Sequence, residues 1–370
     1  MRISIAIEKF DPGVGGAERY CWDLAHSLGV NGHEVEVICM KGLESDLSSI
    51  HINFIHPIRF PQGLRHLSFA ILHYFKVKRL STDIDFCVGN TFYMDIYQPH
   101  GGLHRVWFER DILRYPPGFR KIIGLLRRFS LKDMVQRGLE WWIFKITKPE
   151  VIAISEMVGN DIMNRFKYPS DKVHLIPNGI DTKRFSPENK RYRKEIRDRY
   201  GLNEDDFIFL FVANNLKLKG FNILLDAIKN LYNFPFKVLV IGPDSLWLKA
   251  KVKRTGLSDK VIFGGRADDI ECIYPCCDCL IHPTYYDACS LVVLEALASG
   301  IPVITTETNG ASMYIRPGNG FVVPSADPLA LELAMEQAYA KGPEVREVLT
   351  FKNHDEVFAD VARVIEGCGR

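Results

Sequence analysis

Phe207-Ile208-Phe209-Leu210-Phe211-Val212-Ala213 runs into the polar loop Asn214-Asn215-Leu216-Lys217-Leu218-Lys219-Gly220, and a helical pattern follows over 221–232. An apolar run of this length predicts a strand buried on both faces of a parallel sheet. A strand, a loop and a helix in this order form one half of a βαβ unit, which is typical of α/β proteins. Open α/β sheets bind ligands at the carboxyl ends of their strands, so this loop is a candidate ligand contact.

The same alternation extends along the whole chain in two successive blocks. It predicts two Rossmann-like, doubly wound domains over 1–170 and 171–350 that face each other across a deep ligand-binding cleft. A polar stretch over 180–204, after the turn Pro177-Asn178-Gly179, is the expected linker, and 351–370 is expected to be a helix packing back toward the first domain. The predicted strands are 3–8, 34–40, 53–58, 86–89 and 151–155, then 172–177, 207–213, 237–242, 261–264, 279–282 and 302–306.

Composition and charge argue against several classes of function. The chain has 370 residues, of which 47% are hydrophobic and 25% charged, and its formal net charge is only +2. Nucleic acid is not an expected partner, because duplex-binding proteins carry a strong basic excess on one face. No apolar run approaches about 18 residues, and the first residues lack the pattern of a signal peptide, so a cytoplasmic protein is expected.

Nine cysteines are scattered along the chain, and reduced thiols are the simplest interpretation. Four of them, Cys272, Cys276, Cys277 and Cys279, are close in sequence but lack the spacing of paired C-x-x-C zinc ligands. We predict that they are packing side chains and that the protein holds no metal or other cofactor. Asp83-Ile84-Asp85 has the spacing of a metal-binding acidic motif, but it precedes its strand.

A glycine-rich turn, Gly13-Val14-Gly15-Gly16, follows the first predicted strand and opens a helix. Glycines let the backbone approach a ligand closely, and the N–H groups at a helix start favour an anion. The dinucleotide fingerprint G-x-G-x-x-G is not met, because its third glycine position is occupied by Glu18. An anion or sugar contact at Gly15 and Gly16 is favoured over a plain tight turn.

An acidic pair, Asp287 and Glu295, flanks the start of a predicted helix near Ser290. The backbone N–H groups of Ser290, Leu291 and Val292 are candidate phosphate donors, and carboxylates accept well from vicinal hydroxyls. The alternative is that Asp287 only caps the helix and that Glu295 is solvated.

Two lysines, Lys217 and Lys219, follow the strand quoted first. Fixed positive charge at a strand's carboxyl end stabilises a diphosphate leaving group. A solvated basic loop is the alternative for the lysines taken alone.

Several motifs occur together in the order seen in one enzyme family. The chain resembles family 4 retaining glycosyltransferases of GT-B fold, and within them it is similar to glucosyltransferases of the lipopolysaccharide inner core. The motifs that carry this resemblance are Gly15-Gly16-Ala17-Glu18-Arg19, Ile176-Pro177-Asn178-Gly179-Ile180-Asp181, Lys219-Gly220, and Asp287 with Glu295 eight positions later, followed by Ala296-Leu297-Ala298-Ser299-Gly300-Ile301-Pro302.

The resemblance implies roles for individual residues. Glu295 would hold the nucleotide ribose, Asp287 and backbone near Ser290 the donor sugar, and Lys219 the diphosphate. Gly15 and Gly16 would close over the diphosphate, Arg266 would lie by the base, and His100 would face the reacting sugar, although a structural histidine is the equal alternative. Two departures stand out. The family usually has glutamate at the position of Asp287 and often has arginine at that of Asn214, so Lys217 is the candidate for the second positive charge.

The implied activity is the retaining, metal-independent transfer of a hexose. Glucose from UDP-glucose is the best candidate donor, and a lipopolysaccharide core or another membrane-associated glycan the acceptor. None of these motifs contains an obvious carboxylate nucleophile, so the working hypothesis is a same-face attack in which the departing phosphate oxygen takes the acceptor proton. The alternatives are a sugar-nucleotide epimerase or phosphorylase of the same fold, or a non-catalytic sugar-nucleotide-binding protein.

A basic and aromatic segment over 104–148 interrupts the alternation. It carries eleven lysines and arginines against four acids, with apolar and aromatic side chains interleaved. A basic amphipathic helix of this kind binds anionic membrane surfaces, which predicts a peripheral protein at the inner face of the cytoplasmic membrane. Packed helices with solvated outer faces are the alternative.

Overall fold

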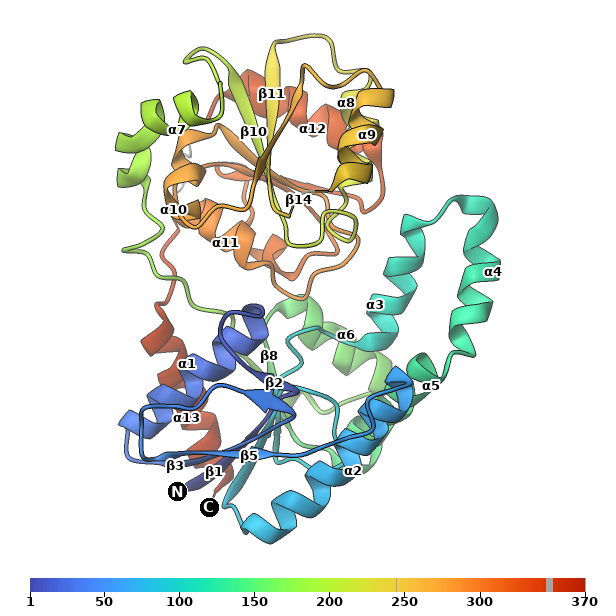
Figure 1. Ribbon diagram of the computed structural model, residues 1–370, viewed down its shortest axis with the longest axis vertical. Helices are drawn as coiled ribbons and strands as arrows, with labels where there is room; N and C mark the ends of the chain where they lie inside the picture. The colour runs from blue at the N-terminus through green and yellow to red at the C-terminus, as the bar shows by residue number, and fades with distance from the viewer. Residues whose placement is uncertain (244, 344–348, 370) are drawn as a thin grey trace. The chain divides into compact units, whose positions relative to one another are not determined.

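The computed structural model describes residues 1–243, 245–343 and 349–369, and the chain divides into two compact units. Unit 1 comprises residues 1–178 together with the segment that begins at His354, and unit 2 comprises Gly179–Asn353. Each unit contains a parallel sheet with helices packed on it (Figure 1). The prediction of an α/β chain built from two Rossmann-like domains is therefore confirmed.

The main sheet of unit 1 is parallel throughout and has the strand order β5-β3-β1-β6-β7-β8-β9. Ile3 and Ile5 of β1 are fully buried, as expected for a central strand that is covered on both faces. The strand order reverses between β1 and β6, so the loops that follow these two strands flank a topological switch point. The strands are β1 (Arg2–Ala6), β3 (Glu34–Cys39), β5 (Ile50–Phe54), β6 (Ile84–Cys87), β7 (Ile96–Tyr97), β8 (Glu150–Ala153) and β9 (Val173–Leu175), and a separate pair is formed by β2 (Lys9–Phe10) and β4 (Lys41–Gly42).

The helices of unit 1 form where apolar residues recur with helical spacing. In α1, Cys21, Leu24, Ala25 and Leu28 are buried, which places one stripe of the helix on the core. The helices are α1 (Gly16–Val30), α2 (Gln62–Leu80), α3 (His104–Asp111), η1 (Ile112–Arg114), α4 (Pro117–Arg128), α5 (Leu131–Trp142), η2 (Ile143–Thr147), α6 (Glu156–Phe166), η3 (Ser170–Lys172) and α13 (His354–Cys368).

The basic segment over 104–148 forms α3, η1, α4, α5 and the π-helical η2. In Figure 1, α3 and α4 extend away from the sheet of unit 1. No residue of α4 is buried, whereas Asp133, Leu139 and Glu140 of α5 are. Across the residues that the structure describes, no helix is both long enough and apolar enough to span a bilayer.

Helix α13 lies far from the rest of unit 1 in sequence but belongs to its core. Val357, Phe358, Val361 and Ile365 are buried in the same cluster as the residues of β1 and α1. Their successive spacings of one, three and four residues place them on one face of the helix. Unit 1 is therefore closed by a segment that follows unit 2 in the chain.

The sheet of unit 2 is also parallel throughout, with the strand order β12-β11-β10-β13-β14-β15. β10 is the strand quoted first from the sequence, and its central position explains why Ile208 to Phe211 are fully buried. The order reverses between β10 and β13, which is the switch point of this unit. The strands are β10 (Phe207–Val212), β11 (Phe236–Ile241), β12 (Val261–Gly265), β13 (Cys279–His282), β14 (Val303–Thr306) and β15 (Gly320–Val323), and the helices are η4 (Pro187–Tyr192), α7 (Arg193–Arg199), α8 (Phe221–Ile228), α9 (Leu246–Arg254), α10 (Ile270–Ile273), η5 (Tyr274–Cys276), α11 (Leu291–Ala298), η6 (Gly310–Tyr314) and α12 (Pro328–Lys341).

The domain boundary predicted at 170/171 is wrong. β9 pairs with β8 and completes the sheet of unit 1, so the chain leaves this unit only after Asn178. The expected linker over 180–204 is also wrong, because this stretch belongs to unit 2, where η4 and α7 pack against η5. The guanidinium of Arg197 is fully buried there and donates to the carboxylate of Asp278 at 2.9 Å. Alternating periodicity shows that a strand exists but not which sheet it joins.

Candidate functional site

The loops after β10 and β13 bring Lys219 and Asp287 into contact. The two strands are parallel neighbours, so both loops leave the sheet from the same edge beside the switch point. The Lys219 ammonium donates to the Asp287 carboxylate and forms an ion pair with it. Both side chains are largely buried, with 28% of Lys219 and 16% of Asp287 exposed. Two residues 68 positions apart in sequence are thus joined by the strand order.

Gly220 fixes the lysine loop against the strand that carries the acid. Its φ of +83° lies in the left-handed region, which glycine adopts without strain. A Cβ atom at this position would lie 1.9 Å from the carbonyl oxygen of Pro283, so only glycine lets the two backbones approach so closely. The conformation of Gly220 therefore holds Lys219 next to the Asp287 loop.

The charge state of Asp287 follows from its surroundings. Burial opposes ionisation of the carboxyl, but the Lys219 ammonium and the His282 ring outweigh burial and hold the pKa of Asp287 well below its usual range. The His282 Nε2 atom lies 3.5 Å from Asp287 Oδ2 and 3.2 Å from Ser290 Oγ. Burial lowers the pKa of His282, so this ring is neutral at neutral pH. The site presents an ionised carboxylate, an ammonium and a neutral imidazole.

The start of α11 offers fewer donors than predicted. Ser290 is the N-cap residue, but its backbone N–H donates to Asn309 Oδ1 at 3.2 Å, so the expectation that this group is available to a phosphate is wrong. Leu291 and Val292 lie in the first turn, where N–H groups have no partner within the helix. Within the described ranges no acceptor faces the N–H groups of Leu291 and Val292, so these two remain candidate anion donors.

Glu295 lies on the flank of α11 and contacts Tyr274. The Tyr274 hydroxyl donates to Glu295 Oε2 at 2.7 Å. Burial raises the pKa of Glu295, while this hydrogen bond and the charge of Arg184 act in the opposite direction. Arg184 itself is paired with Glu271 at 2.9 Å. Glu295 is therefore a fixed acceptor that belongs to a separate hydrogen-bond group from Asp287.

Lys217 and Arg266 have exposed side chains. They follow the carboxyl ends of β10 and β12 in the sheet of unit 2. The Lys217 ammonium lies 4.2 Å from the centre of the Trp247 ring, which is a cation–π contact. Arg266 follows β12 directly, and no hydrogen bond or ion pair is found for its side chain among the described residues. The structure does not join either residue to Lys219 and Asp287.

Gly15, Gly16 and His100 belong to unit 1. Gly15 is the N-cap of α1, with extended backbone, and Gly16 is the first residue of that helix. His100 lines a cavity of about 270 Å³ at the switch point between β1 and β6. Burial lowers the pKa of His100 to about 4, and its Nε2 atom is buried with no partner among the described residues. The other residues lining the cavity are Ile7, Glu8, Ala17, Glu18, His66, Phe69, Val88, Gly89, Asn90, Gly101 and Gln136.

The cysteines predicted as packing side chains are free thiols. Cys276, Cys277 and Cys279 are buried, and burial raises the pKa of each thiol. The Cys276 thiol donates to the carbonyl oxygen of Cys272 at 3.0 Å. In the described part of the chain, no three His, Cys, Asp or Glu side chains are grouped so that they could hold a metal ion.

Models of known protein families match both units of the chain. The family model described as Glycosyltransferase Family 4 matches residues 14–184, and that described as Glycosyl transferases group 1 matches residues 192–352. A crystal structure of WaaG, a glycosyltransferase involved in lipopolysaccharide biosynthesis, superposes with a TM-score of 0.79 over 99% of this chain and 100% of that one, at 20% identity. The chain is a GT-B glycosyltransferase.

Relatives of this GT-B glycosyltransferase have different substrates. It is 26% identical to a glycosyltransferase of Methanocaldococcus jannaschii over 85% of this chain and 83% of that protein. It is also 26% identical to the lipopolysaccharide glucosyltransferase WaaG of Escherichia coli, over 61% of this chain and 62% of WaaG. The N-acetyl-alpha-D-glucosaminyl L-malate synthase of Bacillus anthracis is 24% identical over 86% of this chain and 82% of its own length. Membership of the family therefore leaves donor and acceptor open.

In this GT-B glycosyltransferase, His282, Asn309 and Tyr274 contact predicted site residues but were not themselves predicted from the sequence. His282 is the last residue of β13, and the rule that ligands bind at strand carboxyl ends could have found it. Asn309 is the N-cap of η6, and Tyr274 lies in the short helix η5. No spacing in the sequence connects these two residues to α11, because the tertiary fold alone brings them there.

Proposed function

We propose that this GT-B glycosyltransferase transfers a hexose from a nucleoside-diphosphate sugar to a membrane-associated glycan. Glucose from UDP-glucose is the best candidate donor and a lipopolysaccharide core the best candidate acceptor. The contact between Lys219 and Asp287 carries the proposal, because it sets a cation for the diphosphate beside a carboxylate for the sugar hydroxyls. The similarity to the glucosyltransferase WaaG supports glucose. Solved structures of Anabaena HepE with UDP and with UDP-glucose share the fold, with TM-scores of 0.70 and 0.68.

The chemistry we propose is metal-independent and retains the anomeric configuration. Lys219 and the N–H groups of Leu291 and Val292 would stabilise the departing diphosphate, since fixed donors act most strongly where negative charge develops. The departing phosphate oxygen would take the proton of the acceptor hydroxyl as the new glycosidic bond forms on the same face. Asp287 would orient the donor sugar, because its pairing with Lys219 makes the carboxylate a poor nucleophile. His100, neutral at neutral pH, would hydrogen-bond the reacting sugar through Nε2.

The test is the release of nucleotide from a panel of nucleotide sugars. UDP-glucose is expected to be hydrolysed slowly without acceptor and faster with it. Lys219→Met is expected to lower the rate roughly 100-fold, in line with the loss of one transition-state donor. Lys253→Met, which removes an exposed lysine on α9, is the matched control and is expected to retain the full rate. Release of no nucleotide from any donor would contradict the proposal and favour a binding protein.

We also propose that α4 attaches the protein to the inner face of the cytoplasmic membrane. Phe119, Ile122, Leu125, Leu126 and Phe129 are between 57% and 70% exposed and fall on one face of about 120°. Lys121 and Arg128 are exposed on the same helix. An exposed apolar face flanked by cations is suited to an anionic bilayer surface.

Arg127 does not belong to this membrane-facing set. Its guanidinium lies 2.5 Å from the Asp111 carboxylate and 5.0 Å from the centre of the Phe108 ring. Arg127 therefore attaches α4 to α3, and its replacement would disturb the packing of the two helices rather than test membrane binding alone.

A further inference from the structure

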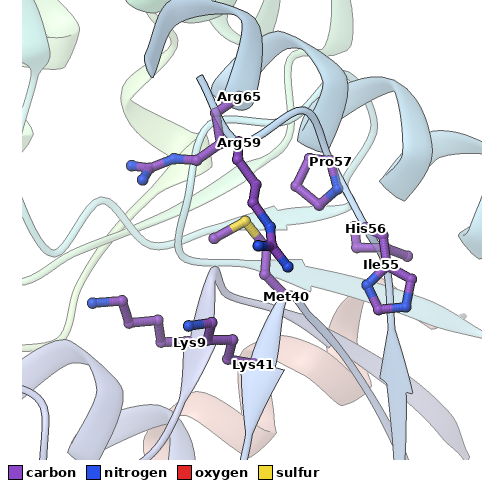
Figure 2. Close-up of a pocket in the computed structure, with 8 residues that line it drawn as sticks. All are labelled: Lys9, Met40, Lys41, Ile55, His56, Pro57, Arg59 and Arg65. Carbon is purple, nitrogen blue, oxygen red and sulfur yellow. The ribbon is translucent and has the colours of Figure 1, made fainter. Parts of the chain in front are cut away.

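A second pocket in unit 1 is lined by positive charge and takes no part in the proposed chemistry. It has a volume of about 390 Å³, which is within the range of small-ligand sites. Figure 2 shows Lys9 and Lys41 reaching into it from one side and Arg59 and Arg65 from the other. The remaining lining residues are Met40, Ile55, His56 and Pro57, so the lining includes no carboxylate.

The fold forces the two lysines together. β2 and β4 pair in parallel with Lys9 directly opposite Lys41. Like charges at directly opposed positions on neighbouring strands repel each other. Gly42 lets this ribbon close, because a Cβ atom there would lie 3.0 Å from the carbonyl oxygen of Phe10. A bound anion would relieve the repulsion that the register imposes.

The positive charge of this pocket is only partly compensated among the described residues, because the Glu8 carboxylate interacts with the charges of Arg65 and Lys9 but not with those of Lys41 and Arg59. Within the described ranges no ion pair or hydrogen bond is found for the side chains of Lys9, Lys41 or Arg59. Arg65 pairs with Glu8 at 3.4 Å, but its Nε atom is buried without a partner in the part of the chain that the structure describes. Two guanidinium groups and two ammonium groups around one space match the oxygens of a phosphate, which arginine binds in bidentate fashion.

The basic pocket shares a wall with the His100 cavity. Glu8 lines the cavity, and its carboxylate contacts Arg65, which lines the pocket, and His66, which lines the cavity, at 3.4 and 2.8 Å. Both spaces lie at the carboxyl ends of strands of the same sheet. One layer of side chains therefore separates the candidate sugar site at His100 from the basic pocket.

We propose that the basic pocket binds a phosphate group carried by the acceptor, so that the acceptor is a phosphorylated glycan. This proposal rests on the proposed function and adds the chemical class of the acceptor. The phosphate would enter the space between Lys9, Lys41, Arg59 and Arg65, while the acceptor sugar occupies the cavity beside His100.

The direct test uses inorganic phosphate and the full chain. Thermal unfolding is measured with increasing phosphate at constant ionic strength, with chloride as the reference salt. Phosphate is expected to raise the Tm of the wild type, because a ligand that binds only the folded state stabilises it. The double variant Lys41→Gln/Arg59→Gln is expected to lose this shift. Arg79→Gln, an exposed arginine at the end of α2, is the matched control and is expected to keep it.

The second arm uses one glycan acceptor before and after phosphatase treatment. The wild type is expected to show at least a tenfold lower KM for the phosphorylated form, and this ratio is expected to fall toward one in the double variant. An equal phosphate shift in the double variant and the wild type, or equal KM values for both acceptors, would overturn the proposal.

Three further outcomes distinguish a lipid headgroup from an acceptor phosphate, and failure of the acceptor assignment from failure of the proposed function. One outcome is that the wild type binds phosphatidylglycerol vesicles that the double variant does not bind, while inorganic phosphate causes no Tm shift. In that case the pocket binds a lipid headgroup and the proposal is overturned. If no nucleotide sugar releases nucleotide while the phosphate shift is intact, the proposed function fails and the acceptor assignment fails with it. If nucleotide is released but phosphate binding does not depend on Lys41 and Arg59, only the acceptor assignment fails.

Discussion

The Lys219 ammonium holds the Asp287 carboxyl in its ionised form. The ammonium stabilises the carboxylate, and the carboxylate partly neutralises the ammonium that we assign to the diphosphate. A diphosphate that arrives at Lys219 would compete with Asp287 for the same cation. Asp287 would then be freed to accept hydrogen bonds from the hydroxyls of the sugar.

The pairing makes the stability of unit 2 depend on pH. The pKa of Asp287 is below its usual range in the folded protein, so the pair stabilises the fold fully above about pH 4, the ordinary value for aspartate, and progressively less as pH falls below it. Asp287→Asn is expected to lower the free energy of unfolding by about 2 kcal/mol at pH 7. Denaturant titrations of both proteins at pH 7 and pH 3 measure this. If the difference in the free energy of unfolding between the wild type and Asp287→Asn does not shrink at pH 3, the role of the ion pair is contradicted.

Gly220 allows a second prediction at the scale of single residues. Gly220→Ala places a Cβ atom against the Pro283 carbonyl and forces an alanine into the left-handed conformation of Gly220. The free energy of unfolding is therefore expected to fall by more than ~2 kcal/mol. Gly201→Ala is the matched control, because Gly201 has φ +64° but no atom within 4 Å of the added Cβ. It is expected to cost only about 1 kcal/mol. Equal losses in the two variants, measured by denaturant unfolding, would show that the close approach of Pro283 does not matter.

At the scale of elements, loops at sheet switch points account for most candidate residues. In unit 2 the loops after β10 and β13 carry Lys219 and Asp287, and in unit 1 the cavity beside His100 lies between the ends of β1 and β6. Helix α4 differs from the other α-helices of the described residues, because none of its residues is buried and its apolar face is exposed.

The membrane proposal predicts that α4 can be changed without loss of fold. Lys121→Glu/Arg128→Glu is expected to abolish flotation with phosphatidylglycerol vesicles, and Leu126→Ser/Phe129→Ser to reduce it several-fold, since both the charges and the apolar face contribute. Lys253→Glu, a charge reversal on α9, is the control. Vesicle binding by both α4 variants at the level of the wild type would exclude α4 as the contact.

At the scale of the whole molecule, unit 1 is built from two separate stretches of chain. α13 contributes Val357, Phe358, Val361 and Ile365 to the core formed by β1 and α1. Two units with separate cores are expected to respond separately to a core substitution.

Ile365→Ala tests this independence. Removing three methyl or methylene groups from a fully buried side chain is expected to cost unit 1 about 3 kcal/mol. Hydrogen exchange is expected to rise in β1, β3 and α1 and to stay unchanged in β10 and β13. Leu329→Ala, at a position 63% exposed on α12, is the control for unit 2. Equal loss of protection in both units would show that they unfold as one body.

The sequence by itself determined the α/β class, the division into two Rossmann-like domains and the family. Apolar runs such as Phe207–Val212 and helical spacing such as that of α1 are local signals, which a chain shows before it folds. The motifs around Lys219 and Asp287 also lie within short stretches of sequence. Their family resemblance is therefore visible without coordinates.

Only the tertiary structure decided which groups meet. In the folded chain, β9 belongs to the first sheet and Lys219 pairs with Asp287. The Ser290 N–H donates to Asn309, and Lys9 lies opposite Lys41. The hydrogen bond between Ser290 and Asn309 joins residues 19 positions apart in sequence, and the ion pair between Lys219 and Asp287 joins residues 68 positions apart. Strand order and register determine such contacts, and both depend on the packing of the whole unit rather than on any local pattern.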